Sequence, residues 1–157
     1  MMSLKENDKA PPFELPDQDG KVRSILDWAG QWLLIYFYPK DDTPGCTAEA
    51  CSLQSRLPDF KNSDLNVVGI STDSVSSHRK FADKYKLSFL LLSDEQKEVV
   101  DLYGVWVKKS FMGNEFMGIA RRSFLINPDG HIARIYTKVD PATHADEVWQ
   151  DFLAFTG

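Results

Sequence analysis

Residues 32–57, WLLIYFYPKDDTPGCTAEACSLQSRL, decide how this chain folds. The run from 32 to 38 is too continuous for an alternating surface strand and is rich in aromatic and branched residues, which predicts a strand buried on both faces near the centre of a sheet. Thr43 followed by Pro44 then indicates a helix start, because the threonine hydroxyl can accept a hydrogen bond from a first-turn amide and proline's missing N–H costs nothing there. We predict that this helix is ended by Pro58.

Cys46 falls in the first turn of the predicted helix. Several backbone N–H groups lack partners there and the helix dipole is positive, so the thiolate is favoured over the thiol. The loop from a central strand to a helix is also where open α/β sheets usually place their ligands. A lone cysteine is more often a small buried hydrophobic residue, but Thr43, Pro44 and Gly45 ahead of Cys46 favour a nucleophile that solvent can reach.

Cys51 makes a redox pair with Cys46. Five residues of ideal helix separate their Cα atoms by roughly 8 to 9 Å, from about 7.5 Å of rise and a rotation of about 140°. A disulfide needs less than about 7 Å. We therefore predict a reduced, helical resting form and an oxidised form in which this segment is locally unfolded. The alternative for the pair is a metal site, but a structural zinc needs four ligands at tight spacings, and none is predicted.

Composition excludes several function classes. The chain has 157 residues, a net charge of −5 and two cysteines. We expect one domain over residues 1–157. The acidic balance and the absence of a basic run argue against nucleic-acid and membrane partners. The start of the chain lacks an apolar targeting segment, and no run of about 18 apolar residues occurs, so the expected location is cytoplasmic. In that reducing compartment two close cysteines are more often catalytic or metal-binding than structural.

Strands and helices alternate along the rest of the chain. Residues 1–12 read as an arm over the domain, 13–25 as a peripheral hairpin, and 108–118 as a loop. The other predicted elements are strands at 65–72, 89–92, 121–127 and 132–137, and helices at 74–86, 95–103 and 142–155. This order predicts an α/β fold with a mixed central sheet flanked by helices and an N-terminal hairpin extension.

Two further groups of residues are expected to have structural and not functional roles. The scattered histidines His78, His131 and His144 show no ligand pattern and are expected on the surface or in packing. The apolar side chains of the 108–118 segment could border a substrate or partner surface, but we expect them to fold back onto the core; they are Phe111, Met112, Phe116 and Met117.

The segment YPKDDTPGCTAEAC resembles the active-site signature of the peroxiredoxins, PxxxTxxC, with Pro39, Thr43 and Cys46 at the matching positions. The second cysteine five residues on is similar to the peroxiredoxin Q or bacterioferritin comigratory protein branch. The resemblance covers nearly the whole chain, because further matching segments follow in the expected order: GISTDS, HRKFADKY, LLSDE, YGVW, KSFMG and RRSFLINPDG.

The resemblance implies a thioredoxin-like fold and thiol-dependent reduction of hydroperoxides. It assigns Cys46 as the peroxidatic cysteine, Cys51 as the resolving cysteine, Thr43 as the hydroxyl that holds the peroxide, and Pro39 as the residue that shields the pocket. The family's arginine in an RxSF pattern selects Arg121. Arg122 faces the opposite side of the strand in this interpretation, although a strand-end arginine can also be a simple salt-bridge residue.

The expected partners are a hydroperoxide substrate and thioredoxin or glutaredoxin as reductant, with no cofactor and a monomeric state. Two other functions remain open. A protein disulfide oxidoreductase usually shows Cys-x-x-Cys, which this chain lacks. A peroxide-sensing binding module on the same fold is the non-enzymatic alternative.

Overall fold

The centre of the molecule is a five-stranded mixed sheet. The computed structural model describes residues 3–157, and the strand order is β5-β4-β3-β8-β9. Strands β3, β4 and β5 are parallel, while β8 is antiparallel to both β3 and β9. Their bounds are β3 (Trp32–Phe37), β4 (Leu65–Ser71), β5 (Leu90–Ser93), β8 (Arg122–Ile126) and β9 (Ile132–Tyr136).

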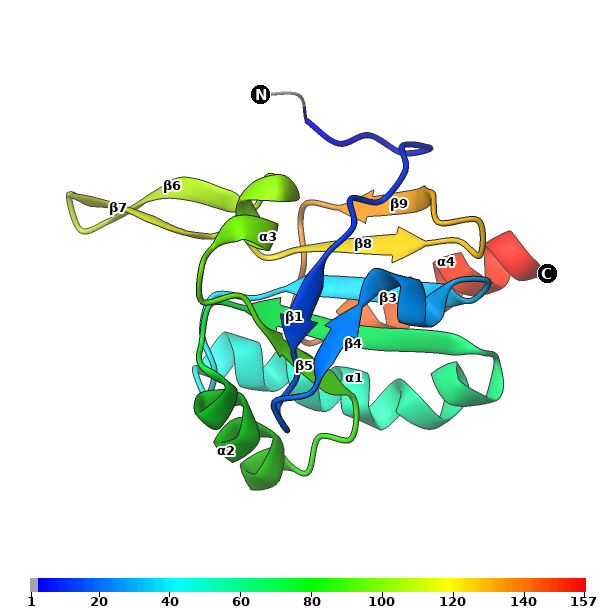
Figure 1. Cartoon of the computed structure of the whole chain (residues 1–157), viewed down its shortest axis with the longest axis horizontal. Coiled ribbons are helices and arrows are strands. Elements are labelled where there is room, and N and C mark those ends of the chain that lie inside the picture. Colours follow the sequence, from blue (N-terminus) through cyan, green and yellow to red (C-terminus); the bar gives the residue numbers. More distant parts are fainter. Residues whose placement is uncertain (1–2) are drawn as a thin grey trace.

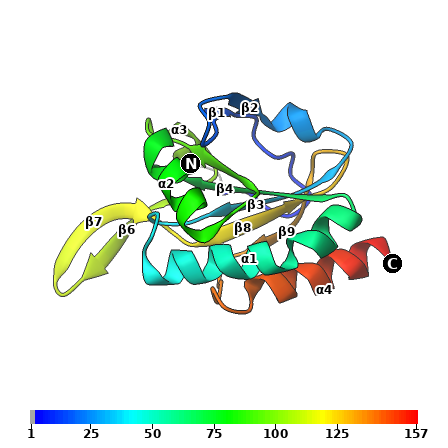
Figure 2. The same cartoon turned by 90° about the horizontal axis from the view of Figure 1, so that it is seen from below.

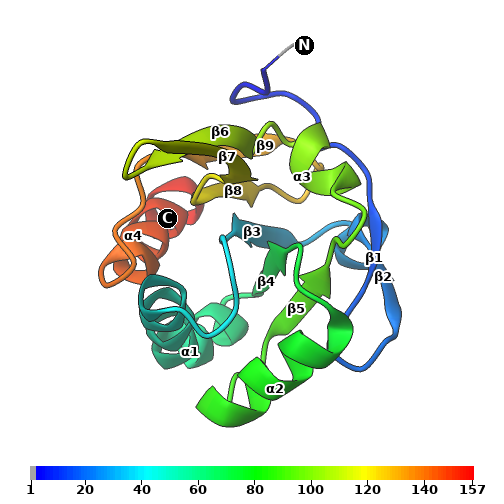
Figure 3. The same cartoon turned by 90° about the vertical axis from the view of Figure 1, so that its left-hand side faces the viewer.

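Both faces of the sheet are covered (Figures 2 and 3). One face packs against α1 (Pro44–Asn62), α2 (Val75–Tyr85) and α4 (His144–Thr156). The other is covered by the N-terminal arm, the hairpin of β1 (Glu14–Pro16) and β2 (Val22–Ser24), the 3₁₀ helix η1 (Ile25–Trp28) and α3 (Glu98–Leu102). The predicted fold class is confirmed, and α3 is shorter than the predicted helix at 95–103.

Strand β3 explains the continuous apolar run. Its alternate side chains enter two different hydrophobic clusters: Leu34 and Tyr36 face the α1 side, while Leu33 and Ile35 face the α3 side. All four are at most 1% exposed. Because β3 pairs with β4 on one edge and β8 on the other, it is central as predicted, and its carboxyl end delivers the chain to the start of α1.

Pro58 does not end α1, contrary to the prediction. The helix continues to Asn62 with Pro58 inside it. Leu57 and Phe60 are buried on either side of this proline, and Pro58 itself is exposed. Burial of the apolar face therefore outweighs the backbone hydrogen bond that a proline removes from a helix interior.

The segment at 108–118 is a β-hairpin and not the predicted loop. Strands β6 (Trp106–Phe111) and β7 (Asn114–Ile119) pair antiparallel through six register partners. Met112 and Gly113 join them with φ values of 51° and 82°, and positive φ at both central residues suits a two-residue hairpin turn. The hairpin projects from the body at the end of the molecule where α1 begins (Figures 1 and 2).

The N-terminal arm pairs with the beginning of β9. The Asn7 N–H donates to the Ile132 carbonyl at 2.7 Å, and the Ala10 N–H donates to the Gly130 carbonyl at 2.9 Å. This matches the predicted arm, of which residues 1 and 2 lie outside the described part. Within residues 3–157, none of the helices combines the length and apolar character that crossing a membrane requires.

Candidate active site

Cys46 lies in the first turn of α1, as predicted. Thr43 is the N-cap residue and Pro44 occupies the first helical position. The first backbone bond of the helix runs from the Thr47 N–H to the Thr43 carbonyl at 2.8 Å, so the N–H groups of Gly45 and Cys46 lie ahead of the ladder. The predicted capping role of the Thr43 side chain is wrong, because its hydroxyl instead donates to the Lys40 carbonyl at 2.8 Å.

Arg121 contacts the sulfur of Cys46. Its Nη2 lies 3.4 Å from Sγ, and its Nη1 donates to Oε1 of Glu49 at 2.7 Å. One guanidinium therefore bridges the thiol and a carboxyl group on the next turn of the same helix. The neighbouring Arg122 bonds the Gly104 carbonyl at 3.2 Å. Of the two arginines, Arg121 is the one at the cysteine.

Glu49 is a member of this site to which the sequence assigned no definite role. It is fully buried, and burial raises its pKa to about 7 although the Arg121 charge and hydrogen bond oppose the shift. Its Oε2 atom, like the nearby buried Tyr36 hydroxyl, has no hydrogen-bond partner among the described residues. The signal was available, because residues three apart in a helix share a face and Glu49 follows Cys46 at that spacing.

Cys46 is less accessible than expected, at 1% exposure. The first turn of α1 lies against the sheet, and Cys46 belongs to the same hydrophobic cluster as Tyr36 and Ala50. The thiol is nonetheless not enclosed by hydrocarbon alone, because the Arg121 guanidinium contacts it. The cysteine is therefore almost completely covered in this conformation.

Cys51 occupies the same intact helix as Cys46. Both cysteines are free, and Cys51 is half-buried. Side-chain bonds from α1 to other elements become dense directly after Cys51, and we call these three the helix clamp: Ser52 Oγ to the Ala142 carbonyl at 3.3 Å, Gln54 Nε2 to Ser88 Oγ at 2.9 Å, and Arg56 Nε to Asp146 Oδ1 at 2.9 Å. Pro39 is half-buried in the turn between β3 and α1.

Comparisons with known proteins show which family the chain belongs to. The sequence profile of the AhpC/TSA family matches residues 7–135. The chain is 47% identical over 148 residues to peroxiredoxin Bcp of Escherichia coli K12, which covers 94% of this chain and 95% of that protein. The chain belongs to the AhpC/TSA family. Within the family it falls in the peroxiredoxin Q and Bcp branch that its sequence resembles.

Solved structures of the branch share the fold. Xylella fastidiosa PrxQ aligns with a TM-score of 0.94 at 30% identity over the whole of both chains. The Xanthomonas campestris bacterioferritin comigratory protein aligns with a TM-score of 0.87 at 36% identity over 92% of each chain. These relatives support a thiol peroxidase activity for this peroxiredoxin.

A buried polar network anchors the turn after β3 in this peroxiredoxin. Oδ2 of Asp41 accepts from Nδ1 of His78 at 2.7 Å and from the Ser77 hydroxyl at 2.8 Å. The Tyr38 hydroxyl donates to Oδ1 at 2.6 Å, and the Asp41 N–H donates to Asp73 at 2.8 Å. Sequence reasoning missed this cluster because His78 lies 37 residues from Asp41 and no motif joins them.

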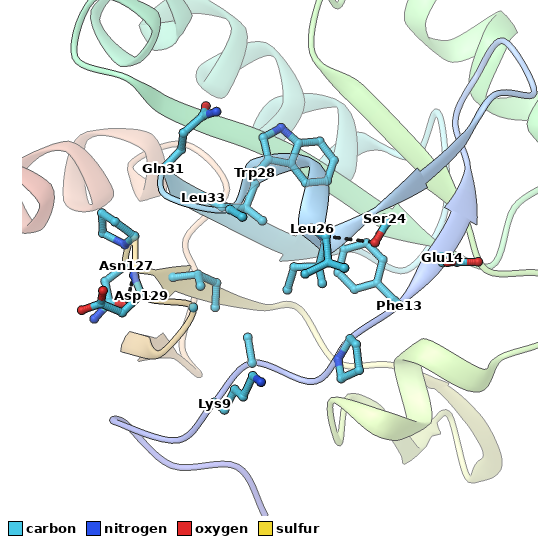
Figure 4. Close-up of a pocket in the computed structure, with 17 residues that line it drawn as sticks. Lys9, Phe13, Glu14, Ser24, Leu26, Trp28, Gln31, Leu33, Asn127 and Asp129 are labelled. Carbon is cyan, nitrogen blue, oxygen red and sulfur yellow. Dashed lines mark hydrogen bonds between the residues drawn. The ribbon is translucent and has the colours of Figure 1, made fainter.

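A cavity of the peroxiredoxin lies away from Cys46. It has a volume of about 640 Å³ between the N-terminal arm, η1 and the β8–β9 turn. Figure 4 shows Phe13, Leu26 and Leu33 among its lining residues. Leu33 faces the cluster on the α3 side of the sheet, whereas Cys46 belongs to the cluster on the α1 side, so this cavity is separate from the candidate active site.

Proposed function

We propose that this protein reduces hydrogen peroxide and organic hydroperoxides through a Cys46 sulfenic acid that Cys51 resolves as an intramolecular disulfide. The observation that carries the proposal is the 3.4 Å contact between the Arg121 guanidinium and the Cys46 sulfur at the start of α1. A cation and a helix amino terminus both favour a thiolate. The alkyl peroxide reduction named for the Xanthomonas relative supports the inclusion of organic hydroperoxides.

In the first step the Cys46 thiolate attacks one oxygen of the peroxide. An S–O bond forms while the O–O bond breaks, and the other oxygen leaves as water or an alcohol after taking up a proton. Negative charge passes from sulfur to oxygen, so fixed donors around the reacting atoms stabilise the transition state. Arg121 Nη2 and the N–H groups that precede the helix ladder are the candidate donors.

Thr43 and Pro39 hold the peroxide in this proposal. The Thr43 hydroxyl donates its hydrogen to the Lys40 carbonyl, so its oxygen is left to accept the O–H of a peroxide. Pro39, half-buried in the same turn, shields the site from water. These two roles follow the family signature.

In the second step the Cys51 thiol condenses with the sulfenic acid and releases water. Because the two cysteines are five residues apart in a helix, roughly 8 to 9 Å between Cα atoms, the first turns of α1 must unwind for the disulfide to form. A dithiol protein, thioredoxin or glutaredoxin, then reduces the disulfide by exchange. We also propose that the protein works as a monomer in the reducing cytoplasm.

The decisive experiment measures peroxide consumption with thioredoxin, thioredoxin reductase and NADPH. Cys46→Ser should abolish turnover. Cys51→Ser should still consume about one equivalent of peroxide per chain and then stall, because the sulfenic acid lacks its partner. Turnover that survives Cys46→Ser would remove the assignment.

The two alternatives predict different results in the same assay. A protein disulfide oxidoreductase would exchange disulfides with little response to peroxide. A peroxide sensor would be oxidised once and would not be recycled at a catalytic rate. The Arg121 contact with Cys46 favours peroxide reduction over disulfide exchange, since it offers a cation to the leaving oxygen. The rate of recycling separates the peroxidase from the sensor.

A further inference from the structure

The β6–β7 hairpin carries a cation toward the candidate active site. Lys109 and Phe116 are register partners across the hairpin, so their side chains lie on the same face. The alternation of strand side chains adds Phe111 and Gly118 to that face. We call it the inner face, defined by Lys109, Phe111, Phe116 and Gly118.

The Lys109 side chain leans toward the base of the hairpin. A Cβ atom on Gly118 would lie 3.2 Å from Lys109 Cδ and 3.5 Å from Phe116 Cε2. The lysine stem therefore crosses the bare backbone of Gly118, two residues closer to the base than Phe116. From Gly118 the chain leads through Ile119 and Ala120 directly to Arg121.

Electrostatics agree with this direction. Burial lowers the pKa of Lys109, the Arg121 cation lowers it further, and the Cys46 sulfur acts in the opposite sense. The charges of Lys109, Arg121 and Cys46 therefore influence one another. The hairpin and the start of α1 also lie at the same end of the molecule (Figures 1 and 2).

Lys109 is a cation without a partner in the described part of the chain. Both ends of the Arg121 fork are occupied, by Glu49 and Cys46. Lys108, on the opposite face of the hairpin, pairs with Glu115 at 2.7 Å. Lys109 makes neither a hydrogen bond nor an ion pair with any side chain in residues 3–157.

Because Cys46 is buried, the organic part of a large substrate is the part that can contact the inner face. Since the cysteine is 1% exposed, the organic part of a large hydroperoxide stays outside the site when its O–O group reacts at the sulfur. There it would meet two exposed aromatic side chains, Phe111 at 68% and Phe116 at 49% exposure. The unpaired Lys109 side chain lies on the same face of the hairpin as these rings and leans toward its base.

We propose that Lys109 binds the carboxylate of organic hydroperoxides that carry a negative charge near an apolar group, while Phe111 and Phe116 contact that apolar group. Lys109 is then a specificity-determining residue that favours anionic over neutral substrates. This inference rests on the proposed peroxidase function.

The test compares cumene hydroperoxide with its para-carboxylate, two substrates of one scaffold that differ by a single charge. The readout is the ratio of their kcat/KM values, which does not depend on the folded fraction of a preparation. Lys109→Gln should lower the ratio of carboxylated to neutral substrate about fivefold, which is equivalent to about 1 kcal/mol, the upper end for an exposed ion pair. Lys109→Glu should lower it further.

Lys108→Gln is the matched control, because it removes one positive charge from the same hairpin but on the opposite face. It should leave the ratio unchanged. A Lys109→Gln variant that keeps the wild-type ratio, including one that slows both substrates equally, overturns the proposal. Hydrogen peroxide separates this failure from a failure of the peroxidase assignment, which would be a wild-type protein that reduces none of the three peroxides.

Discussion

The guanidinium of Arg121 is shared between two acidic groups. One nitrogen contacts the Cys46 sulfur and the other bonds Glu49, a carboxyl group that burial holds at a pKa of about 7. While Glu49 is protonated, the thiolate has the full benefit of the cation. When Glu49 ionises, the two anions compete for the same charge.

Arg121→Gln should lower kcat/KM for hydrogen peroxide about 100-fold or more, the usual effect of removing one donor that stabilises transition-state charge. Arg122→Gln is the matched control, because that neighbouring arginine bonds the Gly104 carbonyl instead. Steady-state kinetics on both variants check the prediction. Comparable losses in the two would contradict the role of the Cys46 contact.

Glu49 should make stability fall with rising pH. Its folded pKa of about 7 lies above the ordinary glutamate value of 4.5, so between these values the folded state binds more protons than the unfolded state. The free energy of unfolding should therefore lose up to about 1.4 kcal/mol per pH unit from this group. Urea titrations from pH 5 to pH 7 should show a flatter slope for Glu49→Gln, and identical slopes would refute the assignment.

The residues of the site were only partly predictable. The signature and the RxSF pattern selected Cys46, Thr43 and Arg121, because short motifs specify the residue types and spacing that the site requires. The Thr43 hydrogen bond to Lys40 was not predictable, since a hydroxyl at a helix start can serve either the helix or the preceding turn.

The two halves of helix α1 differ in how firmly side-chain bonds tie them to other elements. The helix clamp holds it from Ser52 onward. Among the described residues, the side chains of the preceding turns bond another element only at Arg121, through Glu49 and Cys46. Unwinding should therefore stop at Ser52, and the segment that must open is the one that carries both cysteines.

Amide hydrogen exchange of the oxidised protein should show this limit. Disulfide formation should remove protection from Thr47 to Ser55, whose amide N–H groups bond carbonyls four residues earlier in the unwound segment, and leave protection at Arg56 and Leu57. Gln54→Ala breaks the paired bonds to Ser88 and should extend the loss of protection toward Leu57. Full protection at Thr47 in the oxidised protein would contradict the proposed unwinding.

Two element predictions failed for reasons that the sequence does not contain. Pro58 ends a helix in isolation, but Leu57 and Phe60 bury the same face on both sides of it. The 108–118 segment has glycines that suggest a loop, and Phe111, Met112, Phe116 and Met117 are exposed instead of folded onto the core. Packing against the rest of the chain decided the first case, and a two-residue turn at Met112 and Gly113 decided the second.

Across the whole molecule, two hydrophobic clusters pack on opposite faces of one sheet. Each strand of the sheet contributes to both, and β3 supplies alternate residues to each. The central strands were predictable because burial on both faces leaves a continuous apolar run. The network of Asp41 and His78 was not, since it depends on how α2 sits against the β3–α1 turn.

The shared sheet predicts one cooperative unfolding transition for the whole chain. Leu53→Ala on the α1 side and Val100→Ala on the α3 side should each shift the entire transition, at a cost of about 1–5 kcal/mol. Calorimetry checks this by comparing calorimetric and van't Hoff enthalpies. Two separable transitions would contradict a single domain over residues 1–157.

The unequal exposure of the two cysteines has a practical consequence. A bulky aromatic disulfide reagent, offered in excess to the native protein, should label Cys51 promptly and Cys46 only slowly, because Cys46 is almost completely covered. Labelling kinetics thus report how often the first turns of α1 open spontaneously. The same burial should prevent large electrophiles from modifying the Cys46 sulfur before it reacts with peroxide.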